Sequence, residues 1–307
     1  KVGSLTGAQI KGLGVEQVKG MSDEQLKGLS KTQVQALTAA QINGLEINQI
    51  QQLNVETLNL KGLTKLDALS KEQVQGLSAA QLKSLSDEQI TALGVNIDQV
   101  SKENFTVFTA KQLGALDDAQ IAKLTTDQVG NLTSAQIKGL KPEQLAKFGE
   151  EQIADLSKDR IKDLSAAQLN QLSDKQIQKL NVDGMEFLSA AALKGLSVDS
   201  IKNLSDAQVE KLTALQLKAL TPDQIASIEK DDFAKIDASK LGALSAGQIA
   251  KLTEDQLGTL DSDKVKALGA TQVKALTTEQ IGFLSKEQVG YLSEKQVQSL
   301  TAAQINA

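Results

Sequence analysis

The chain contains no histidine, no cysteine and no tryptophan. Without histidine and cysteine, the usual zinc, haem and thiol sites lack their ligands. The numerous serine and threonine hydroxyls have no histidine that could activate them as nucleophiles. We therefore expect no catalytic residue, no cofactor-binding residue, no cofactor and no metal ligand, and we interpret the protein as something other than an enzyme.

Aromatic residues make up only 2% of the chain, and the formal net charge is −5, with lysine and acidic residues interspersed. The few aromatics do not alternate with basic residues and no basic block exists, so nucleic-acid binding is not expected. No apolar run approaches the roughly 18 residues of a membrane span, which argues against membrane insertion within this segment. The hydrophobic fraction of 40% is sufficient for a packed core, and that core must be aliphatic.

What the sequence does contain is a repeat of eight residues with the consensus L-[ST]-x-x-Q-[IVL]-x-x. Numbered from its leucine, this octad runs from Leu5 to Leu93 and resumes at Phe108 through Leu300. Position 6 is apolar in every octad except the one that carries Asp98. Position 1 departs from leucine at Met21, Lys61, Phe108, Phe148, Ile228 and Ile236. A period held over so much of the chain predicts a repeat architecture.

Three structures could use this period. In one continuous helix the apolar positions would drift around the axis by about 80° per octad, so no fixed face could be buried. A β-solenoid with one short strand per octad is permitted by the valine and isoleucine at position 6, but the abundant alanine, lysine, glutamine and glutamate disfavour it. One short helix per octad is the interpretation we prefer, with the β-solenoid as the alternative.

Four signals favour the short helix. Position 2 carries mostly residues that cap helix N-termini, and glutamine at position 5 completes a capping box. The only two prolines, Pro142 and Pro222, both occupy position 3, which is the first helical residue and tolerates proline. Acidic residues gather at positions 3 and 4 and lysines at positions 7 and 8, as the helix dipole favours.

These helices must pack against one another, because helices of about six residues do not survive alone in water. We expect leucine at position 1 and the apolar residue at position 6 to form a continuous core. Small residues at position 8, such as Gly44, would let adjacent turns approach closely. The predicted fold is all-α, a repeat solenoid with one capped helix per octad that forms an elongated superhelical rod.

The glutamine column at position 5 has two structural explanations. In the first, each glutamine only completes its own capping box, and its replacement by alanine costs about 0.5–1 kcal/mol. In the second, successive glutamines also hydrogen-bond to one another in a ladder along the rod. A substrate-binding role for this column is not expected.

The array divides into a first octad block at residues 1–93, an irregular register slip at 94–107 and a second block at 108–307. The slip is either a hinge or partner site or, as we prefer, a tolerated irregularity of a fold in which each repeat contacts only its neighbours. Residues 59–69 keep the octad register but move their leucines to Leu60 and Leu63, which we interpret as local repacking. Because the chain opens and stops inside repeat sequence, we expect one continuous array that is a piece of a longer protein.

Several local patterns resemble functional sites, and we interpret all of them as structural. The acidic pairs Asp117-Asp118, Glu150-Glu151 and Asp231-Asp232 fall at or near first helical turns, where carboxylates offset the helix dipole. The sequence DSDK at 261–264 lacks the glycine and distant glutamate of a calcium loop. GLGVEQ at 12–17 has no strand before it, as a phosphate loop would. The large residues at position 8 could form an exposed stacking site: Phe187, Phe283 and Tyr291.

The octads LTAAQI, LSAAQL, LTTDQV and LTTEQI resemble the repeat arrays of very large bacterial surface or secreted proteins, often described as adhesin-like. The resemblance covers essentially the whole chain and transfers no site residue. It implies an extracellular or cell-surface location and a structural role, as a stalk or spacer or as a component of a filament. Its implied partners are other copies of the chain in a fibre, or a host or cell-surface partner bound through flanking domains. The alternative is an interaction scaffold whose solenoid surface binds a protein or a glycan.

Overall fold

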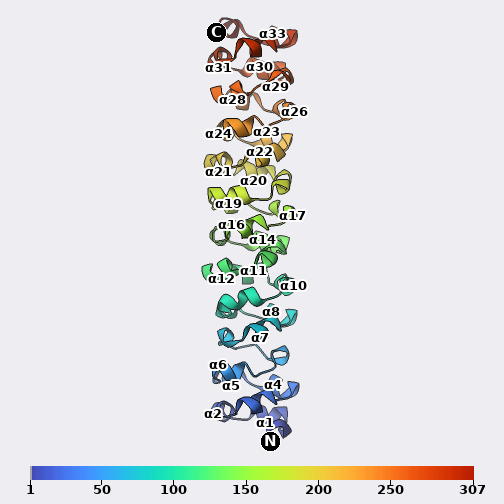
Figure 1. Cartoon of the computed structure of the whole chain (residues 1–307), viewed down its shortest axis with the longest axis vertical. Coiled ribbons are helices and arrows are strands. Elements are labelled where there is room, and N and C mark those ends of the chain that lie inside the picture. The colour runs from blue at the N-terminus through green and yellow to red at the C-terminus, as the bar shows by residue number, and fades with distance from the viewer. Residues whose placement is uncertain (1) are drawn as a thin grey trace. The chain divides into compact units, whose positions relative to one another are not determined.

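A computed structural model describes residues 2–307 and is all-helical over that range, with no strand. The predicted all-α repeat solenoid is therefore confirmed, and the β-solenoid alternative is wrong. The chain forms two compact units, of which the first ends at Asp155 and the second is Leu156–Ala307. In Figure 1 the short helices of each unit follow one another in chain order.

The first unit begins with a short 3-10 helix, and its α-helices recur at octad spacing, interrupted by three further 3-10 helices. Its elements are η1 (Val2–Ser4), α1 (Gly7–Lys11), α2 (Val15–Lys19), α3 (Asp23–Lys27), α4 (Lys31–Ala36), α5 (Ala39–Asn43), α6 (Ile47–Ile50), η2 (Val55–Thr57), η3 (Leu66–Ala68), α7 (Lys71–Gln75), α8 (Ala79–Lys83), α9 (Asp87–Ala92), η4 (Gly94–Gln99), α10 (Lys102–Phe105), α11 (Ala110–Gly114), α12 (Asp118–Lys123), α13 (Thr126–Gly130), α14 (Ser134–Gly139), α15 (Pro142–Leu145) and α16 (Glu150–Ala154).

The second unit keeps the octad spacing throughout. Its elements are α17 (Lys158–Ile161), α18 (Ala166–Leu169), α19 (Asp174–Lys179), η5 (Val182–Phe187), α20 (Ala190–Lys194), α21 (Val198–Lys202), α22 (Asp206–Lys211), α23 (Ala214–Ala219), α24 (Pro222–Ser227), α25 (Lys230–Phe233), α26 (Ala238–Leu241), α27 (Ala246–Ile249), α28 (Glu254–Gly258), α29 (Ser262–Ala267), α30 (Ala270–Ala275), α31 (Thr278–Phe283), α32 (Lys286–Gly290), α33 (Glu294–Ser299) and α34 (Ala302–Ile305).

Capping boxes start most of these helices, as the sequence predicts, although α17 and α20 begin without one. At α14 the Thr133 hydroxyl accepts the backbone N–H of Gln136 at 3.3 Å, and Gln136 Oε1 accepts the backbone N–H of Thr133 at 2.8 Å. Both prolines are the first residue of their helices, α15 and α24. The 3-10 helices η2, η3 and η4 occur where the octad departs from the S/T-x-x-Q pattern, so no capping box forms there.

Within each unit a helix packs mainly against the third helix before it and the third after it. This pattern joins α1 to α4 and α11 to α14 in the first unit, and α21 to α24 and α26 to α29 in the second. The core between them is built from pairs, each made of the apolar residue at position 6 and the residue three places later, at position 1. Ile137 and Leu140, for example, are 0% and 4% exposed. We call two such residues a core pair.

The spacing of core pairs explains the irregular stretch around Lys61. Successive core pairs there begin at residues 50, 55, 60, 66 and 74, so four repeats fill the length of three octads. Leu60 and Leu63 are buried while Lys61 is exposed, which shows that the leucines displaced from the octad positions form a core pair of their own. The array tolerates repeats of five and six residues because only the three-residue spacing within each core pair is kept.

Another shortened repeat lies between Ile90 and Ile97, where core pairs begin at residues 90, 97 and 105. The next core pair is aromatic: Phe105 and Phe108 are both buried, and their rings meet edge to face with centroids 5.3 Å apart. Edge-to-face contact is a favoured arrangement for aromatic pairs. Both phenylalanines therefore belong to the core, and neither offers an exposed binding surface.

Small residues at position 8 allow close packing between turns, as expected, at several glycines. A Cβ atom built on Gly139 would lie 2.2 Å from the Cβ of Ala110, in the helix packed against it. A Cβ on Gly44 would lie 2.3 Å from Val15 Cγ1. At Gly12, by contrast, a Cβ would meet only the carbonyls of its own helix. The requirement for glycine thus depends on whether another turn lies against that position.

Candidate functional site

The glutamine at position 5 is the most consistent polar feature of the fold, and it does more than cap its own helix. Gln136 is 1% exposed, and its Nε2 donates to the carbonyl oxygens of Phe105 and Phe108 at 2.9 and 3.0 Å. These two residues are a core pair of an earlier turn. The side chain therefore accepts one hydrogen bond from its own helix cap and donates two to the main chain of another turn.

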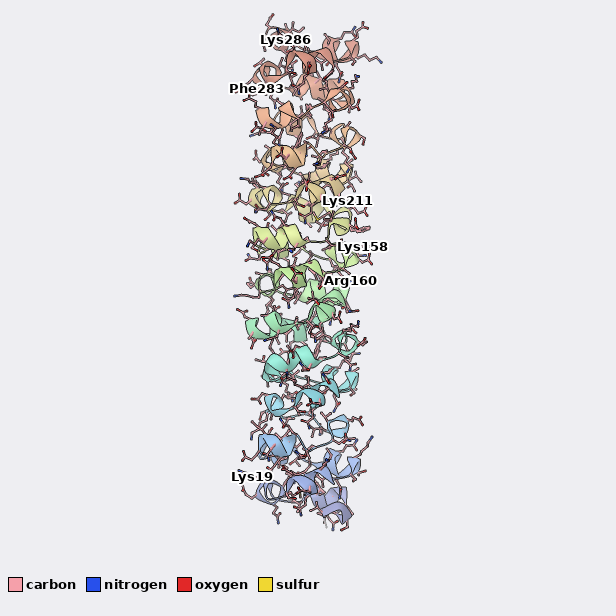
Figure 2. The ribbon with its side chains drawn as sticks, viewed as in Figure 1. Lys19, Lys158, Arg160, Lys211, Phe283 and Lys286 are labelled. Carbon is pink, nitrogen blue, oxygen red and sulfur yellow. The ribbon has the colours of Figure 1, made fainter. Side chains whose placement is uncertain are left out.

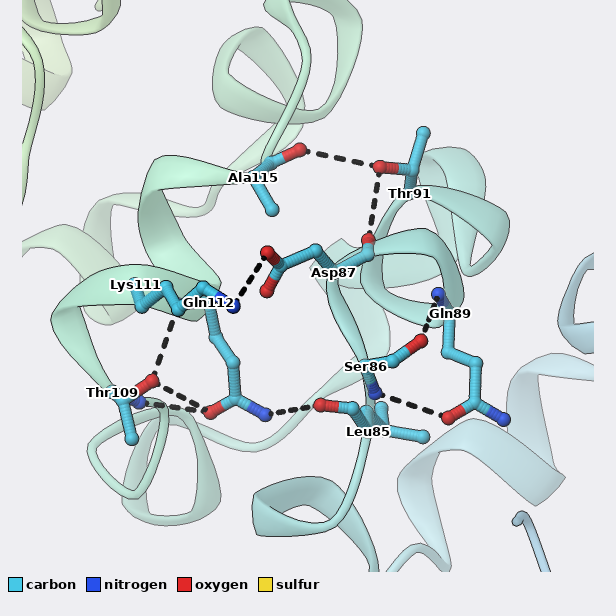
Figure 3. Close-up of polar contacts among 9 residues, drawn as sticks. All are labelled: Leu85, Ser86, Asp87, Gln89, Thr91, Thr109, Lys111, Gln112 and Ala115. Carbon is cyan, nitrogen blue, oxygen red and sulfur yellow. Dashed lines mark hydrogen bonds and ion pairs between the residues drawn. The ribbon is translucent and has the colours of Figure 1, made fainter. Parts of the chain in front are cut away.

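Figure 3 shows the same arrangement one turn earlier in the first unit, around α11. Gln112 Nε2 donates to the Leu85 carbonyl at 2.9 Å, while its Oε1 accepts the backbone N–H of Thr109 at 2.9 Å. Beside them Lys111 Nζ lies 3.0 Å from an Asp87 carboxylate oxygen, so an exposed ion pair joins the same two turns. We call the repeated glutamine-to-carbonyl bonds the glutamine ladder.

The number of core pairs, and not the number of residues, separates each glutamine from its acceptors. In regular octads the glutamine binds the fourth core pair before its own, as Gln208 does with Ile177 and Leu180. Gln73 binds Ile50 and Leu53, which are far closer in sequence but still four core pairs earlier. The count is unchanged because Val55/Leu58, Leu60/Leu63 and Leu66/Leu69 are the pairs between. A turn of the solenoid is thus defined by core pairs, whatever the length of each unit.

This geometry corrects the predicted form of the ladder. Within residues 2–307, glutamines of this column such as Gln216 donate from Nε2 to backbone carbonyl oxygens of an earlier turn, here those of Met185 and Leu188, and not to the next glutamine. The sequence shows that a glutamine donor recurs every eight residues, but it does not show which atoms accept its hydrogen bonds.

Some octads lack the glutamine and keep the bond. Lys65 Nζ donates to the Leu45 carbonyl at 3.0 Å, and Asn104 Nδ2 donates to the Leu77 carbonyl at 3.2 Å. Lys264, which is 8% exposed, donates from Nζ to the carbonyl of Ala234. All three side chains share with glutamine an N–H donor on the residue directly before a core pair. Lysine and asparagine can thus replace glutamine as donors to the earlier turn, whereas Gly184 and Ala192 occupy position 5 without a side-chain donor.

Asp232 is an exception, because a carboxylate in this column carries no donor when ionised. Burial raises the pKa of the Asp232 carboxyl, and the nearby charges of Glu229, Asp206 and Asp231 raise it further. Its core pair is Phe233/Ile236, so by the order of the repeats a glutamine in its place would donate to the carbonyls of Ile201 and Leu204. An ionised aspartate cannot make these bonds, which makes this a weak point of the ladder.

Ion pairs on the outer surface also connect turns, and they contribute little to stability. Lys19 and Glu46 lie 3.1 Å apart, and Lys211 and Asp183 lie 3.1 Å apart, with all four side chains well exposed. The hydrogen bond from Lys19 to Glu46 raises the pKa of the lysine, and the bond from Lys211 to Asp183 acts in the same way. Figure 2 shows Lys19 and Lys211 on the outside of the fold. Exposed pairs of this kind contribute little to stability, because water and salt screen them.

The acidic pairs predicted to offset helix dipoles do lie at helix starts. Asp117 caps α12, its Oδ1 accepting the backbone N–H of Gln120 at 2.8 Å, and Asp118 pairs with Lys147 at 2.9 Å. Glu150-Glu151 and Asp231-Asp232 fall in the first turns of α16 and α25. Within residues 2–307 no group of three or more acidic side chains is placed to hold a metal ion.

The remaining sequence candidates are also accounted for by the fold. In DSDK the Asp261 carboxylate caps α29 by accepting the backbone N–H of Lys264 at 2.9 Å. In GLGVEQ, Gly14 is the N-cap of α2. The position 8 aromatics Phe187 and Phe283 are 43% and 37% exposed, and Phe283 lies at the surface in Figure 2. They come from separate parts of the second unit and do not form a stacking platform with each other.

Three exposed apolar residues were missed by the sequence analysis: Ile47, Val198 and Leu215. Leu215 lies at position 4, which is usually polar, and is 78% exposed. It borders an open groove of about 630 Å³ that also includes Ala214, Lys218, Ala243 and Gly269. The signal was present in the sequence, since leucine at a position that faces solvent in other octads breaks the pattern.

None of the helices between residues 2 and 307 combines the length and the hydrophobicity that crossing a membrane requires. A search of curated proteins found no match to the chain. Residues 259–294, which include α29 to α32, match the family model described as the ALTTAQ repeat. Over this segment the chain is similar to the ALTTAQ repeat, and with its helices stacked at octad spacing it is a repeat protein.

Proposed function

We propose that the chain is a structural spacer, the repeat segment of a bacterial surface or secreted protein, acting as a stalk or as a component of an extracellular filament. The observation that carries this proposal is the glutamine ladder within each unit. Each of its bonds joins neighbouring turns through the main chain, so the polar side chain that recurs in most octads serves the scaffold. Such a chain can hold the segments at its two ends apart without a further loss of conformational entropy, because its backbone is already ordered.

The surface supports the same role. Positions 3, 4 and 7 carry mixed polar residues, and the ion pairs found there are exposed and individually weak. The grooves bordered by described residues are open to solvent, and no cluster among residues 2–307 has the ligands of a metal centre. These features favour a non-enzymatic role.

The extracellular assignment rests on the resemblance of octads such as LTAAQI and LTTDQV to arrays of large bacterial surface proteins. It is tested by treating intact cells that carry the full-length protein with a protease that does not enter them. Cleavage within this segment on intact cells is the expected result. Protection on intact cells, with cleavage after lysis, would place the segment inside the cell.

Small-angle X-ray scattering of the purified chain tests the spacer role directly. A compact domain of 307 residues would have a radius of gyration of about 19 Å. A spacer must give a much larger value, together with the scattering of an extended particle. A value close to that of a compact domain would refute the proposal.

An interaction scaffold is the second candidate, and Leu215 with its groove is the observation that favours it. Contiguous exposed apolar surface in a polar wall is typical of binding sites. If the groove binds a protein or glycan that contacts the solenoid, Leu215→Ser should weaken that binding. Leu217→Ala, a change in the buried core of the same helix, serves as the control for reduced stability.

A further inference from the structure

Asn43, at octad position 7, joins two turns of the first unit by bonds that lie outside the glutamine ladder. Its Nδ2 donates to the carbonyl of Gly62 at 3.2 Å, and its Oδ1 accepts the backbone N–H of Thr64 at 2.9 Å. The two bonds enclose Leu63, the second residue of a core pair in the shortened repeats. We call this arrangement, in which one side-chain amide binds a carbonyl and an N–H two residues apart, the asparagine clamp.

The second unit contains the same clamp at Asn170, which also occupies position 7. Its Nδ2 donates to the carbonyl of Gly195 at 3.0 Å, and its Oδ1 accepts the backbone N–H of Ser197 at 2.9 Å. The Ser200 hydroxyl also donates to this Oδ1, at 3.1 Å. Here too the two backbone bonds enclose the second residue of a core pair, Leu196, so the two clamps form a matched pair.

The two clamps differ in the residue that follows the asparagine. Asn43 precedes Gly44 and is the only asparagine of the sequence followed by glycine, whereas Asn170 precedes Gln171. Glycine has no side chain to hinder its backbone nitrogen, so Asn–Gly is the sequence most prone to deamidation. The Gly44 nitrogen gives up its proton and bonds to Cγ of Asn43, the Cγ–Nδ2 bond breaks, and ammonia leaves. Water then opens the resulting succinimide ring to aspartate or isoaspartate.

Packing between turns accounts for the glycine at residue 44. A Cβ atom on Gly44 would lie 2.3 Å from Cγ1 of Val15, so a larger residue would push the two turns apart. The backbone of Gly44 has φ −77° and ψ −18°, which any residue adopts, so its conformation does not require glycine. The labile sequence is therefore a consequence of the close approach of Val15.

The folded chain keeps the reacting atoms of this sequence apart. The Gly44 N–H donates to the carbonyl of Ala40 at 3.1 Å, while the Asn43 amide is held by its two clamp bonds. Ring closure needs all three hydrogen bonds to break, because the Gly44 nitrogen must turn toward Cγ and the side chain must leave the clamp. The reaction therefore has to pass through a local opening of the fold.

We propose that Asn43 is a site of spontaneous deamidation, and that the reaction permanently releases the clamp on the shortened repeats. Aspartate at residue 43 has no Nδ2 to donate to Gly62. Isoaspartate also adds a methylene to the main chain at Asn43, the last residue of α5. Neither product reverts to asparagine, so the clamps that remain intact decrease with the age of the protein. This site goes beyond the proposed spacer role and does not depend on it.

Peptide mapping by mass spectrometry tests the site on the intact chain, kept in mildly alkaline buffer with and without urea. With three hydrogen bonds to break, each worth roughly fivefold, Asn43 should deamidate about a hundredfold more slowly in the folded chain than in urea. Asn170 should react far more slowly than Asn43 in urea, because Gln171 hinders ring closure. The variant Q171G changes an exposed residue and gives the second clamp the reactive sequence. In this variant Asn170 should deamidate as fast as Asn43 in urea and be protected when folded.

The variant N43D reproduces the aspartate product and shows what the reaction does to the fold. Hydrogen exchange should become faster at the backbone amides of residues 60–65 than in the unmodified chain, because the clamp has lost its donor. The control N54D makes the same change of charge at an exposed asparagine outside the clamp and should leave this exchange less affected. Circular dichroism confirms that both variants are folded.

Four results would overturn the inference. Asn43 could stay intact in urea, react equally fast in the folded chain, or fail to react in the folded chain over the time that the predicted rate requires. Exchange at residues 60–65 could also be the same in N43D as in N54D, which would show that deamidation does not release the clamp.

Discussion

Replacing Gln208 by alanine measures what the glutamine ladder contributes to stability. Its Oε1 accepts the backbone N–H of Ser205 at 2.9 Å, and its Nε2 donates to the carbonyls of Ile177 and Leu180 at 2.8 and 3.0 Å. The side chain is 0% exposed, so water cannot replace these bonds directly. At about 1 kcal/mol for each net hydrogen bond, the loss should be about 3 kcal/mol. A glutamine that only capped its helix would cost about 0.5–1 kcal/mol.

The chain offers a matched control in Gln9, which makes the capping bond to Thr6 at 2.8 Å and no ladder bond. Gln9→Ala should therefore cost about 1 kcal/mol. Urea unfolding followed by circular dichroism gives the free energies, and an unchanged m-value shows that the same cooperative unit is compared. Because repeat proteins can open locally, hydrogen exchange at the amides near each site checks the values independently. Equal costs at the two sites would refute a stabilising ladder.

Gln208→Glu adds a pH test of the same geometry. The ionised carboxylate would keep the cap but face two carbonyl oxygens, so its pKa in the folded state should rise above the unfolded value. A raised folded pKa means that stability is present below the unfolded pKa and is lost as the pH rises through the folded pKa. The variant should thus be less stable than the unmodified protein at neutral pH and recover part of the difference in acid. A difference that does not change with pH would contradict donation to the carbonyls.

Three further changes test the core, the weak point of the ladder and the turn contacts. Leu212→Ala removes a side chain that is 0% exposed and should cost about 2–5 kcal/mol in urea unfolding. Asp232→Gln restores a donor and should stabilise by about 1–3 kcal/mol at neutral pH, a gain that disappears below the ordinary aspartate pKa of 3.8, where Asp232 is protonated. Gly139→Ala should cost about 1–3 kcal/mol, because its Cβ would lie 2.2 Å from Ala110. Gly258→Ala has nothing within 4 Å of the new Cβ and should stabilise the chain by about 0.5–1 kcal/mol. Equal melting temperatures for the two alanine variants would contradict the close approach of Gly139 to Ala110.

The local structure could be predicted from sequence because its determinants are local. Serine or threonine three residues before glutamine fixes where a helix starts, and Pro142 fixes which residue comes first in α15. The acceptors of the ladder could not be predicted in this way. They depend on how many units make one turn, and nothing within an octad specifies that number.

The irregular stretch around Lys61 was only partly interpretable for a related reason. An octad frame placed Lys61 at a core position, whereas the structure buries Leu60 and Leu63. Counting apolar residues three apart, instead of leucines eight apart, would have found the pairs from Ile50 onward. The outer surface was the least predictable part, since Leu215 departs from its column without any local signal of what it contacts.

The acceptors of the ladder are main-chain carbonyl oxygens, which every residue possesses. An octad therefore needs no particular partner sequence in the turn it binds, and Gln128 bonds to the pair Ile97/Val100 as readily as Gln136 bonds to two phenylalanines. If an octad is duplicated or deleted, every later glutamine moves onto a new pair that has the same chemistry. Recombination between octads can therefore lengthen or shorten such an array without compensating substitutions. The number of octads can change while the bonds between neighbouring turns stay the same.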